Sequence, residues 1–254
     1  MSEIKKYRLD KLLSLRYPEL SRTKIQTLVV NGRVQVDRVV TTKVSTRVRE
    51  DAVLFIHEAE ELRYVSRAGH KLEKALDTFS LSVENRVCLD AGLSTGGFTD
   101  CLLQRGAQKV YGIDVGTDQV HQRIKNDERV VVMEQTNIRS VTSLPDPITF
   151  VTLDVSFISV LKVLPAVVPL LAPCADLIIL IKPQFEATSK ALSRGGVVKD
   201  AAVHERVKEN VIAGCKALGL TLASDIITSP LQGAASGNTE FLGWFTYNKK
   251  RALE

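Results

Sequence analysis

Residues 87–99 read VCLDAGLSTGGFT, and this stretch decides the fold. It begins with a short apolar run that ends on an acid, which predicts a buried strand. Gly92, Gly96 and Gly97 then stand where the chain turns into a helix, and glycines let a ligand approach the backbone closely. The start of that helix offers free N–H groups to an anionic group. The stretch therefore predicts a strand, a binding turn and a helix in a cofactor-binding domain.

Strands and helices alternate on both sides of this stretch. Patterns that predict strands lie at residues 86–90, 109–114, 130–134, 148–154, 176–182, 221–228 and 240–248. Patterns that predict helices lie at residues 66–80, 96–104, 118–125 and 203–218, with a further helix within 158–171. Such alternation predicts an α/β fold with a mostly parallel, doubly wound sheet. The last two strands have no helix between them, so we expect one of them to run antiparallel at the sheet edge.

The second strand ends at Asp114, 24 residues after Asp90. An acid at this place suits a bidentate grip on an adenosine ribose. Both NAD and S-adenosylmethionine contain that group, but NAD would require the spacing G-x-G-x-x-G, which the chain lacks. The pattern resembles the first motif of class I methyltransferases, in which the acid helps to hold the aminoacyl end of S-adenosylmethionine. We therefore favour this cofactor, with NAD as the alternative, and expect it to contact Asp90, Gly92, Ser94, Thr95, Gly96, Gly97, Phe98, Thr99, Asp114 and Val115.

The charge of the chain is concentrated at its N-terminus. Residues 1–58 contain 12 Lys+Arg and 7 Asp+Glu, whereas residues 59–254 contain 22 of each, so the net charge of +5 belongs to the first segment. A compact basic module predicts a polyanionic partner, because phosphate contacts release counterions and steer association. A basic face that only confers solubility is the alternative.

This basic segment predicts two short helices, at residues 7–15 and 21–31, followed by short strands within 33–40 and 44–56. Ser21 is expected to cap the second helix and Gly32 to end it. The runs Arg8-Leu9-Asp10, Ser21-Arg22-Thr23-Lys24 and residues 31–37 resemble the S-four-type RNA-binding module. The resemblance implies a module at residues 1–58, a linker at 59–65 and a catalytic domain at 66–254. We expect RNA to contact Arg8, Arg22, Lys24 and Arg33.

Four ionisable residues stand where a doubly wound sheet binds its ligands, at the carboxyl ends of strands or beside them. Asp154 and Lys182 end predicted strands, Glu240 opens the last strand, and Lys71 lies early in the helix at residues 66–80. Two ammonium and two carboxylate groups suit the methylation of a hydroxyl, which must be held in line and lose its proton during attack. A single lysine at a strand end often only extends to water.

In order and context, these four residues resemble the Lys-Asp-Lys-Glu tetrad of FtsJ-like ribose 2′-O-methyltransferases. Residues 65–72, 154–159 and 182–186 are also similar to the TlyA family, whose members join an S-four-type module to such a domain and are often labelled hemolysin A. The resemblance implies a Rossmann-like class I methyltransferase that methylates cytidine ribose in ribosomal RNA or ribosomal subunits. It implies that Lys182 is the base or orients the hydroxyl, and that Asp154 and Glu240 fix the position of Lys182. Lys71 would activate Lys182 or stabilise the negative charge that develops on the oxygen.

Three other functions stay open at this stage. A base N-methyltransferase would favour a proline-containing turn after the fourth strand, where the chain has Asp154-Val155-Ser156-Phe157. A membrane-active hemolysin would need a secretion signal or a convincing spanning segment, and the apolar run at residues 163–181 is interrupted by prolines. The third is an RNA-binding protein with an inactive methyltransferase fold. We expect a cytoplasmic protein that does not act on membranes, with four buried cysteines and no metal site.

Overall fold

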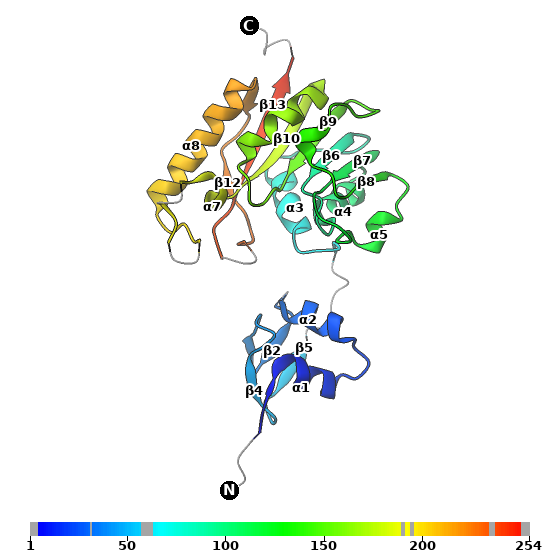
Figure 1. Cartoon of the computed structure of the whole chain (residues 1–254), viewed down its shortest axis with the longest axis vertical. Helices are drawn as coiled ribbons and strands as arrows, with labels where there is room; N and C mark the ends of the chain where they lie inside the picture. Colours follow the sequence, from blue (N-terminus) through cyan, green and yellow to red (C-terminus); the bar gives the residue numbers. More distant parts are fainter. Residues whose placement is uncertain are drawn as a thin grey trace. The chain divides into compact units, whose positions relative to one another are not determined.

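The computed structural model describes residues 5–30, 32–56, 63–188, 191–193, 196–233 and 237–249. The chain divides into two compact units, residues 1–63 and 64–254 (Figure 1). Most of the linker predicted at residues 59–65 lies outside the described residues. The first unit has one hydrophobic cluster and the second has two, and each unit is described by itself.

The first unit is a small α+β module. Two helices lie beside two small antiparallel sheets, one of β1 and β4 and one of order β3-β2-β5. The core is made of leucine, isoleucine and valine side chains from both helices and from β2, β4 and β5. The elements are β1 (Lys6–Arg8), α1 (Leu9–Arg16), α2 (Arg22–Val30), β2 (Val34–Val36), β3 (Val39–Val40), β4 (Arg47–Arg49) and β5 (Leu54–Ile56).

The second helix of this unit begins and ends where its sequence predicts. The Ser21 hydroxyl accepts a hydrogen bond from the Lys24 amide at 3.2 Å, which satisfies one free donor of the first turn. Gly32 adopts φ +69°, a conformation that glycine takes without strain and that commonly ends helices. The first helix starts later than predicted, because Tyr7 belongs to β1 and pairs with Val48.

The second unit is built on one large sheet of order β11-β13-β10-β9-β6-β7-β8, with β12 also paired to β13. The five strands from β10 to β8 are parallel, and β13 runs antiparallel to β10. This confirms the predicted α/β class and the antiparallel direction of one of the last strands, although β13 lies one strand in from the edge, which β11 occupies. The strands are β6 (Val87–Ala91), β7 (Lys109–Ile113), β8 (Val130–Met133), β9 (Ile148–Leu153), β10 (Leu171–Ile181), β11 (Leu220–Leu222), β12 (Ile227–Thr228) and β13 (Phe241–Asn248).

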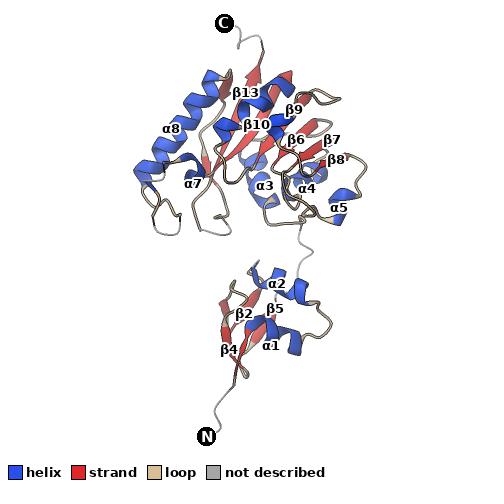
Figure 2. Ribbon diagram, viewed as in Figure 1, coloured by secondary structure: helices blue, strands red, loops and turns tan. Residues whose placement is uncertain are grey.

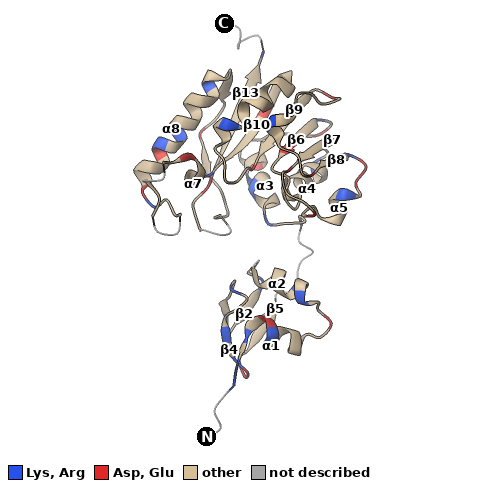
Figure 3. Ribbon diagram, viewed as in Figure 1, with Lys and Arg blue, Asp and Glu red and all other residues tan. Residues whose placement is uncertain are grey.

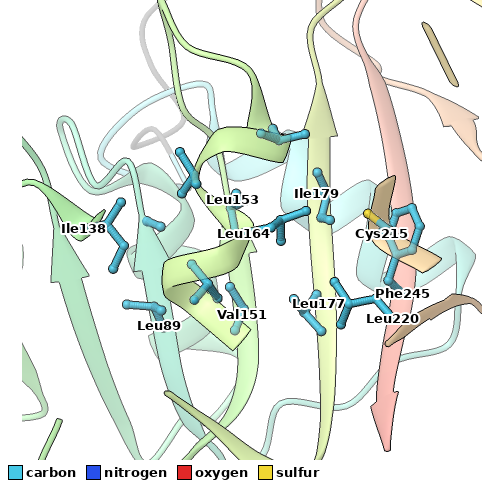
Figure 4. Packing of buried hydrophobic residues seen from close by; sticks show 14 of the residues in the cluster. Leu89, Ile138, Val151, Leu153, Leu164, Leu177, Ile179, Cys215, Leu220 and Phe245 are labelled. Carbon is cyan, nitrogen blue, oxygen red and sulfur yellow. The ribbon is translucent and has the colours of Figure 1, made fainter. Parts of the chain in front are cut away.

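Helices cover both faces of this sheet (Figure 2). Side chains alternate between the faces along a strand: in β10, Leu177 and Ile179 pack with the α6 and α8 side, and Ile178 packs with the α3 and α4 side. Figure 4 shows the hydrophobic cluster on the α6 and α8 side of the sheet, around Leu164, Cys215 and Phe245. The helices are α3 (Gly69–Thr78), α4 (Gly97–Gln104), α5 (Gln122–Lys125), α6 (Leu164–Val167), α7 (Pro183–Glu186) and α8 (Ala201–Ala217), with 3-10 turns η1 (Ile138–Ser140), η2 (Val160–Lys162) and η3 (Val168–Leu170).

Three predicted elements of this unit are wrong in extent. The helix predicted at residues 118–125 is reduced to α5, because Asp118 adopts φ +53° and cannot be helical. The strand predicted at 221–228 is two strands, since the register with β13 shifts between β11 and β12. The strand predicted from Asp176 already begins at Leu171, and its pairing with β9 is irregular between those two residues.

One of the four cysteines was also predicted wrongly. Cys174 lies in the irregular part of β10 and is exposed, whereas Cys88, Cys101 and Cys215 are buried as expected. Burial raises the pKa of the Cys88 and Cys215 thiols to about 12, so both stay protonated at neutral pH.

Candidate functional site

The glycine-rich turn between β6 and α4 is held tightly against the end of β9. Gly92 adopts φ +96°, and a Cβ at this position would lie 2.3 Å from the backbone oxygen of Asp154. The Asp154 amide donates a hydrogen bond to the oxygen of Ala91 at 3.0 Å. Only glycine allows this approach, so the turn and the first residue after β9 form one surface.

Asp90, at the end of β6, stabilises the turn through buried hydrogen bonds. Its carboxylate is fully buried and accepts hydrogen bonds from the Thr99 amide and hydroxyl, at 3.0 and 2.7 Å, and from the Thr152 hydroxyl at 2.9 Å. Burial raises the pKa of Asp90 to about 6, and these hydrogen bonds oppose that shift. Asp90 and Thr99 line neither of the two cavities that adjoin the turn and are described below. They therefore hold the turn in place from within the protein core.

A large cavity of about 510 Å³ opens at the carboxyl ends of β6, β7 and β9. Asp114 lines it and accepts hydrogen bonds from the amides of Ser94 and Gly116, both at 2.7 Å. The volume is typical of a small-molecule site. The lining combines glycine-turn, polar and apolar residues: Gly92, Ser94, Ile113, Asp114, Val115, Gly116, Gln119, Thr136, Asn137, Ile138, Arg139, Asp154, Val155, Ser156, Phe157, Ile158 and Val163.

A small cavity of about 160 Å³ adjoins the large one. The two share Gly92, Ser94, Asp154 and Ser156 in their linings. The small cavity also reaches Lys182, and its remaining wall comes from the turn and from the segment before α3: Ser66, Ala68, Leu93, Thr95, Gly97 and Phe98. A ligand that extends from the large into the small cavity would therefore end beside the Lys182 ammonium.

The four predicted tetrad residues form two ion pairs. Lys182 Nζ lies 2.5 Å from Asp154 Oδ1, and Lys71 Nζ lies 2.5 Å from Glu240 Oε2. All four side chains are largely buried, and Glu240 is the most enclosed with 3% of its surface exposed. Buried charges of this kind are stable only when they are paired.

The sheet brings the two pairs to the same edge. Ile181 of β10 is paired with Phe241 of β13, so Lys182, which follows the one, and Glu240, which precedes the other, lie at neighbouring strand ends. Asp154 follows β9, the other neighbour of β10. The sequence of charges across the edge is therefore Asp154, Lys182, Glu240 and, from α3, Lys71.

An exposed aromatic residue stands beside this edge. Phe157 has 92% of its surface exposed, adopts φ +64° and lines the large cavity. A positive φ is unusual for a bulky residue and is found where function requires a strained backbone. Its ring centroid lies 5.3 Å from that of Phe185, which follows Lys182 on α7. An apolar platform thus borders the charged edge.

The sequence missed several residues that line the cavities. Ser156 accepts a hydrogen bond from Lys182 Nζ at 2.9 Å and lines both cavities. Asn137 and Ile138 belong to the segment that follows β8. The same rule that pointed to Asp114, that ligands bind at carboxyl ends of parallel strands, would have pointed to this segment. Ser66 has no comparable signal, because it precedes a helix.

In the first unit, two of the four predicted RNA-binding residues come together. The guanidiniums of Arg8 and Arg22 lie 3.0 and 3.8 Å from Asp10, which is almost fully buried. The Arg8 guanidinium holds the pKa of the Asp10 carboxyl below its ordinary value. Lys24 is exposed on α2 and Arg33 is half-buried before β2, and no interaction among the described residues joins them to this cluster. Figure 3 shows basic residues on several elements of this unit.

Residues 64–247, which include both cavities and the two ion pairs of the tetrad, match the FtsJ-like methyltransferase family. The chain belongs to this family. Residues 8–54 of this FtsJ-like methyltransferase match the S4 domain, so the small N-terminal unit carries the predicted module. The predicted Rossmann-like methyltransferase fold is confirmed.

Relatives of this FtsJ-like protein span almost its whole length. The 16S/23S rRNA (cytidine-2′-O)-methyltransferase TlyA of Mycobacterium tuberculosis is 40% identical, over 97% of this chain and 92% of the relative. Hemolysin A of Brachyspira hyodysenteriae is also 40% identical, over 94% of this chain and 99% of the relative. Membership of the TlyA family is therefore confirmed.

Two solved structures are similar to this chain. A structure from Streptococcus thermophilus, named a candidate hemolysin, is 37% identical with a TM-score of 0.75 and covers 97% of this chain and 90% of its own. An S-adenosylmethionine-dependent methyltransferase from Mesorhizobium loti is 12% identical with a TM-score of 0.52, over 70% of this chain and 99% of its own, and shares the fold. Within the described residues, no helix has the length and apolarity to cross a membrane, and no cluster of three or more metal-ligating side chains occurs.

Proposed function

We propose that this enzyme transfers a methyl group from S-adenosylmethionine to the ribose 2′-hydroxyl of a cytidine in ribosomal RNA. The observation that carries the proposal is the row of alternating charges, Asp154, Lys182, Glu240 and Lys71, at the edge that adjoins the two cavities. The substrate follows the name of the Mycobacterium tuberculosis relative, an rRNA cytidine-2′-O-methyltransferase. We assign the first unit to RNA binding and the second to catalysis, with the boundary in residues 59–65.

The residues around the large cavity fit this methyl donor. Asp114 presents a carboxylate at the end of β7, where it can accept hydrogen bonds from the two hydroxyls of a ribose. Apolar side chains such as Ile113 and Ile138 offer a slot for a flat base. The glycine turn and the start of α4 suit the amino-acid end of the donor, through free amides and the helix dipole. When bound, the donor supplies an electrophilic methyl group.

We propose that Lys182 binds the reacting hydroxyl of the ribose. Its Nζ borders the small cavity, where the ammonium can donate a hydrogen bond to the hydroxyl oxygen. To act as the base, the side chain must be in the neutral amine form, which takes up the hydroxyl proton and becomes the ammonium. Asp154 and Ser156 fix the position of Nζ, at 2.5 and 2.9 Å. Glu240 and Lys71 lie on the other side, and we assign to Lys71 the stabilisation of negative charge that develops on the oxygen.

We place the target nucleobase against Phe157. A ring with most of its surface exposed beside a charged edge suits stacking of an unpaired base, which contributes about 1–3 kcal/mol per base. The basic module would then hold the RNA around that nucleotide. Replacing Arg22 with Ala should weaken RNA binding and lower the slope of log K against log salt by about 1.

The decisive experiment combines labelled S-adenosylmethionine, ribosomal subunits and three proteins. Wild type should methylate one or a few cytidines, and the modified positions should resist alkaline cleavage because the 2′-hydroxyl is blocked. Lys182→Ala and Lys71→Ala should each lose most of the activity while they still bind the donor in calorimetry. Lys216→Ala, which removes an exposed lysine of α8, is the matched control. Near-normal rates in both tetrad variants would refute the assignment, and methyl groups found on bases would favour an N-methyltransferase.

A further inference from the structure

Two segments that carry residues of the charged edge contact each other at several points. One is residues 154–160, after β9, and the other is residues 182–186, after β10. The contacts between them occur in step along both segments: Lys182 with Asp154 and Ser156, Phe185 with Phe157, and Glu186 with Ser159 and Val160. The near end of this pairing is the proposed catalytic contact, and the far end adds two further hydrogen bonds between the segments.

Glu186 makes the far contact. One carboxylate oxygen accepts a hydrogen bond from the Ser159 hydroxyl at 2.5 Å, and the other accepts one from the Val160 amide at 2.8 Å. Val160 opens the turn η2, whose first amides have no partner within the turn. Glu186 is the last residue of α7, a single turn that begins directly after Lys182. One side chain therefore clamps the turn that follows Lys182 to the turn that follows Asp154.

A carboxylate is an unfavourable group for a purely structural clamp. Burial raises the pKa of Glu186, and hydrogen bonds from Ser159 and Val160 oppose the shift, with no contribution from a neighbouring lysine or arginine of the described residues. A partly buried acid without a cationic partner is costly unless its hydrogen bonds are well placed. Both carboxylate oxygens accept hydrogen bonds from the segment 154–160.

We propose that Glu186 is a positioning residue for methyl transfer, which fixes the Lys182 ammonium against Asp154 and Ser156 by joining the two segments that carry them. The inference rests on the proposed function. Glu186 does not line either cavity, so it acts through Lys182 and touches neither donor nor RNA. Residues 154–158 also line the large cavity, but the groups that we assign to the ribose and the amino-acid end of the donor, Asp114 and the glycine turn, lie on other segments. Loss of the clamp should therefore lower turnover more than donor affinity.

The test measures methyl transfer to ribosomal subunits and donor binding by calorimetry for Glu186→Gln. Glutamine keeps the shape and one oxygen, so it can accept only one of the two hydrogen bonds. We expect turnover to fall about tenfold, because small displacements of a reacting group have effects of this order. The donor Kd and the Tm should stay close to those of wild type. Glu128→Gln, which changes an exposed glutamate before β8, is the control and should have no effect.

A second measurement separates positioning from a general effect on folding. In a Ser156→Ala background, where the position of Lys182 is already loosened, Glu186→Gln should lower turnover by less than about threefold, since residues that act through one group are not additive. Ser159→Ala should reproduce part of the loss and replaces Glu186→Gln if that protein does not fold. Full additivity with Ser156→Ala, or unchanged turnover in an active wild-type background, would overturn the inference alone. An inactive wild type would refute the proposed function and the inference together.

Discussion

The ion pair of Lys71 and Glu240 offers a test that separates stability from catalysis. With 10% and 3% of their side-chain surfaces exposed, both members are buried, and their charged atoms lie 2.5 Å apart. Lys71→Met leaves the Glu240 carboxylate buried without its partner. Breaking a buried pair in this way costs about 3–5 kcal/mol of unfolding free energy. For a domain of this size, a loss of 3 kcal/mol lowers the Tm by roughly 6–12 °C.

The double variant Lys71→Met/Glu240→Met removes both charges and fills their space with side chains of similar length. Replacement of a whole buried pair by apolar residues is often neutral, so its unfolding free energy should return to within about 1 kcal/mol of wild type. Methyl transfer should stay low in both variants, because the double variant restores packing and not the charges. Urea unfolding at several temperatures and a filter assay with labelled donor give the two quantities.

Two results would contradict this reasoning. A single variant as stable as wild type would mean that the Glu240 carboxylate finds another partner or takes up a proton at little cost. A double variant with wild-type turnover would mean that this pair is structural and that Lys182 with Asp154 suffices for catalysis. Only low stability in the single variant, together with recovered stability and low turnover in the double, supports both roles.

Three further predictions concern the turn, a thiol and a buried acid. Gly92→Ala should weaken donor binding at least about tenfold in calorimetry, because the new Cβ meets the Asp154 oxygen at 2.3 Å and the φ of +96° is strained for alanine; an unchanged Kd would show that the donor does not depend on this turn. Cys174 should react with a thiol reagent in the native state and the other three cysteines only after unfolding, since they are buried; two or more fast thiols would contradict the packing described here. Burial raises the pKa of Asp90 to about 6 in the folded protein, so the native state binds the Asp90 proton more tightly than the unfolded state does. The stability that this proton contributes is present below about pH 4 and is lost as the pH rises to 6. The unfolding free energy of wild type relative to Asp90→Asn should therefore fall over this window by on the order of 3 kcal/mol, and a difference that stays constant with pH would refute the shift.

Local patterns were sufficient for much of the fold. The Val87–Ala91 strand and the glycine turn were predictable because a buried parallel strand is a continuous apolar run and a tight turn needs residues that tolerate positive φ. The cap at Ser21 was predictable for a similar reason, since a cap is a contact over three residues. Boundaries were less predictable: Asp118 breaks the expected helix, and the register of β11 and β12 with β13 is set by pairing partners far along the chain.

The four charged residues of the proposed site could be predicted from the sequence, because ionisable side chains at the ends of apolar strands can be recognised without a structure. Their pairing was not visible. Lys71 meets Glu240 across a separation of 169 residues, and it does so because β13 enters the sheet antiparallel beside β10 and carries Glu240 back to the edge where α3 begins. The clamp of Glu186 on Ser159 and the exposure of Phe157 likewise depend on which strand ends become neighbours. Sequence periodicity encodes which face of an element is apolar, whereas contacts between distant segments arise only when the whole sheet has been assembled.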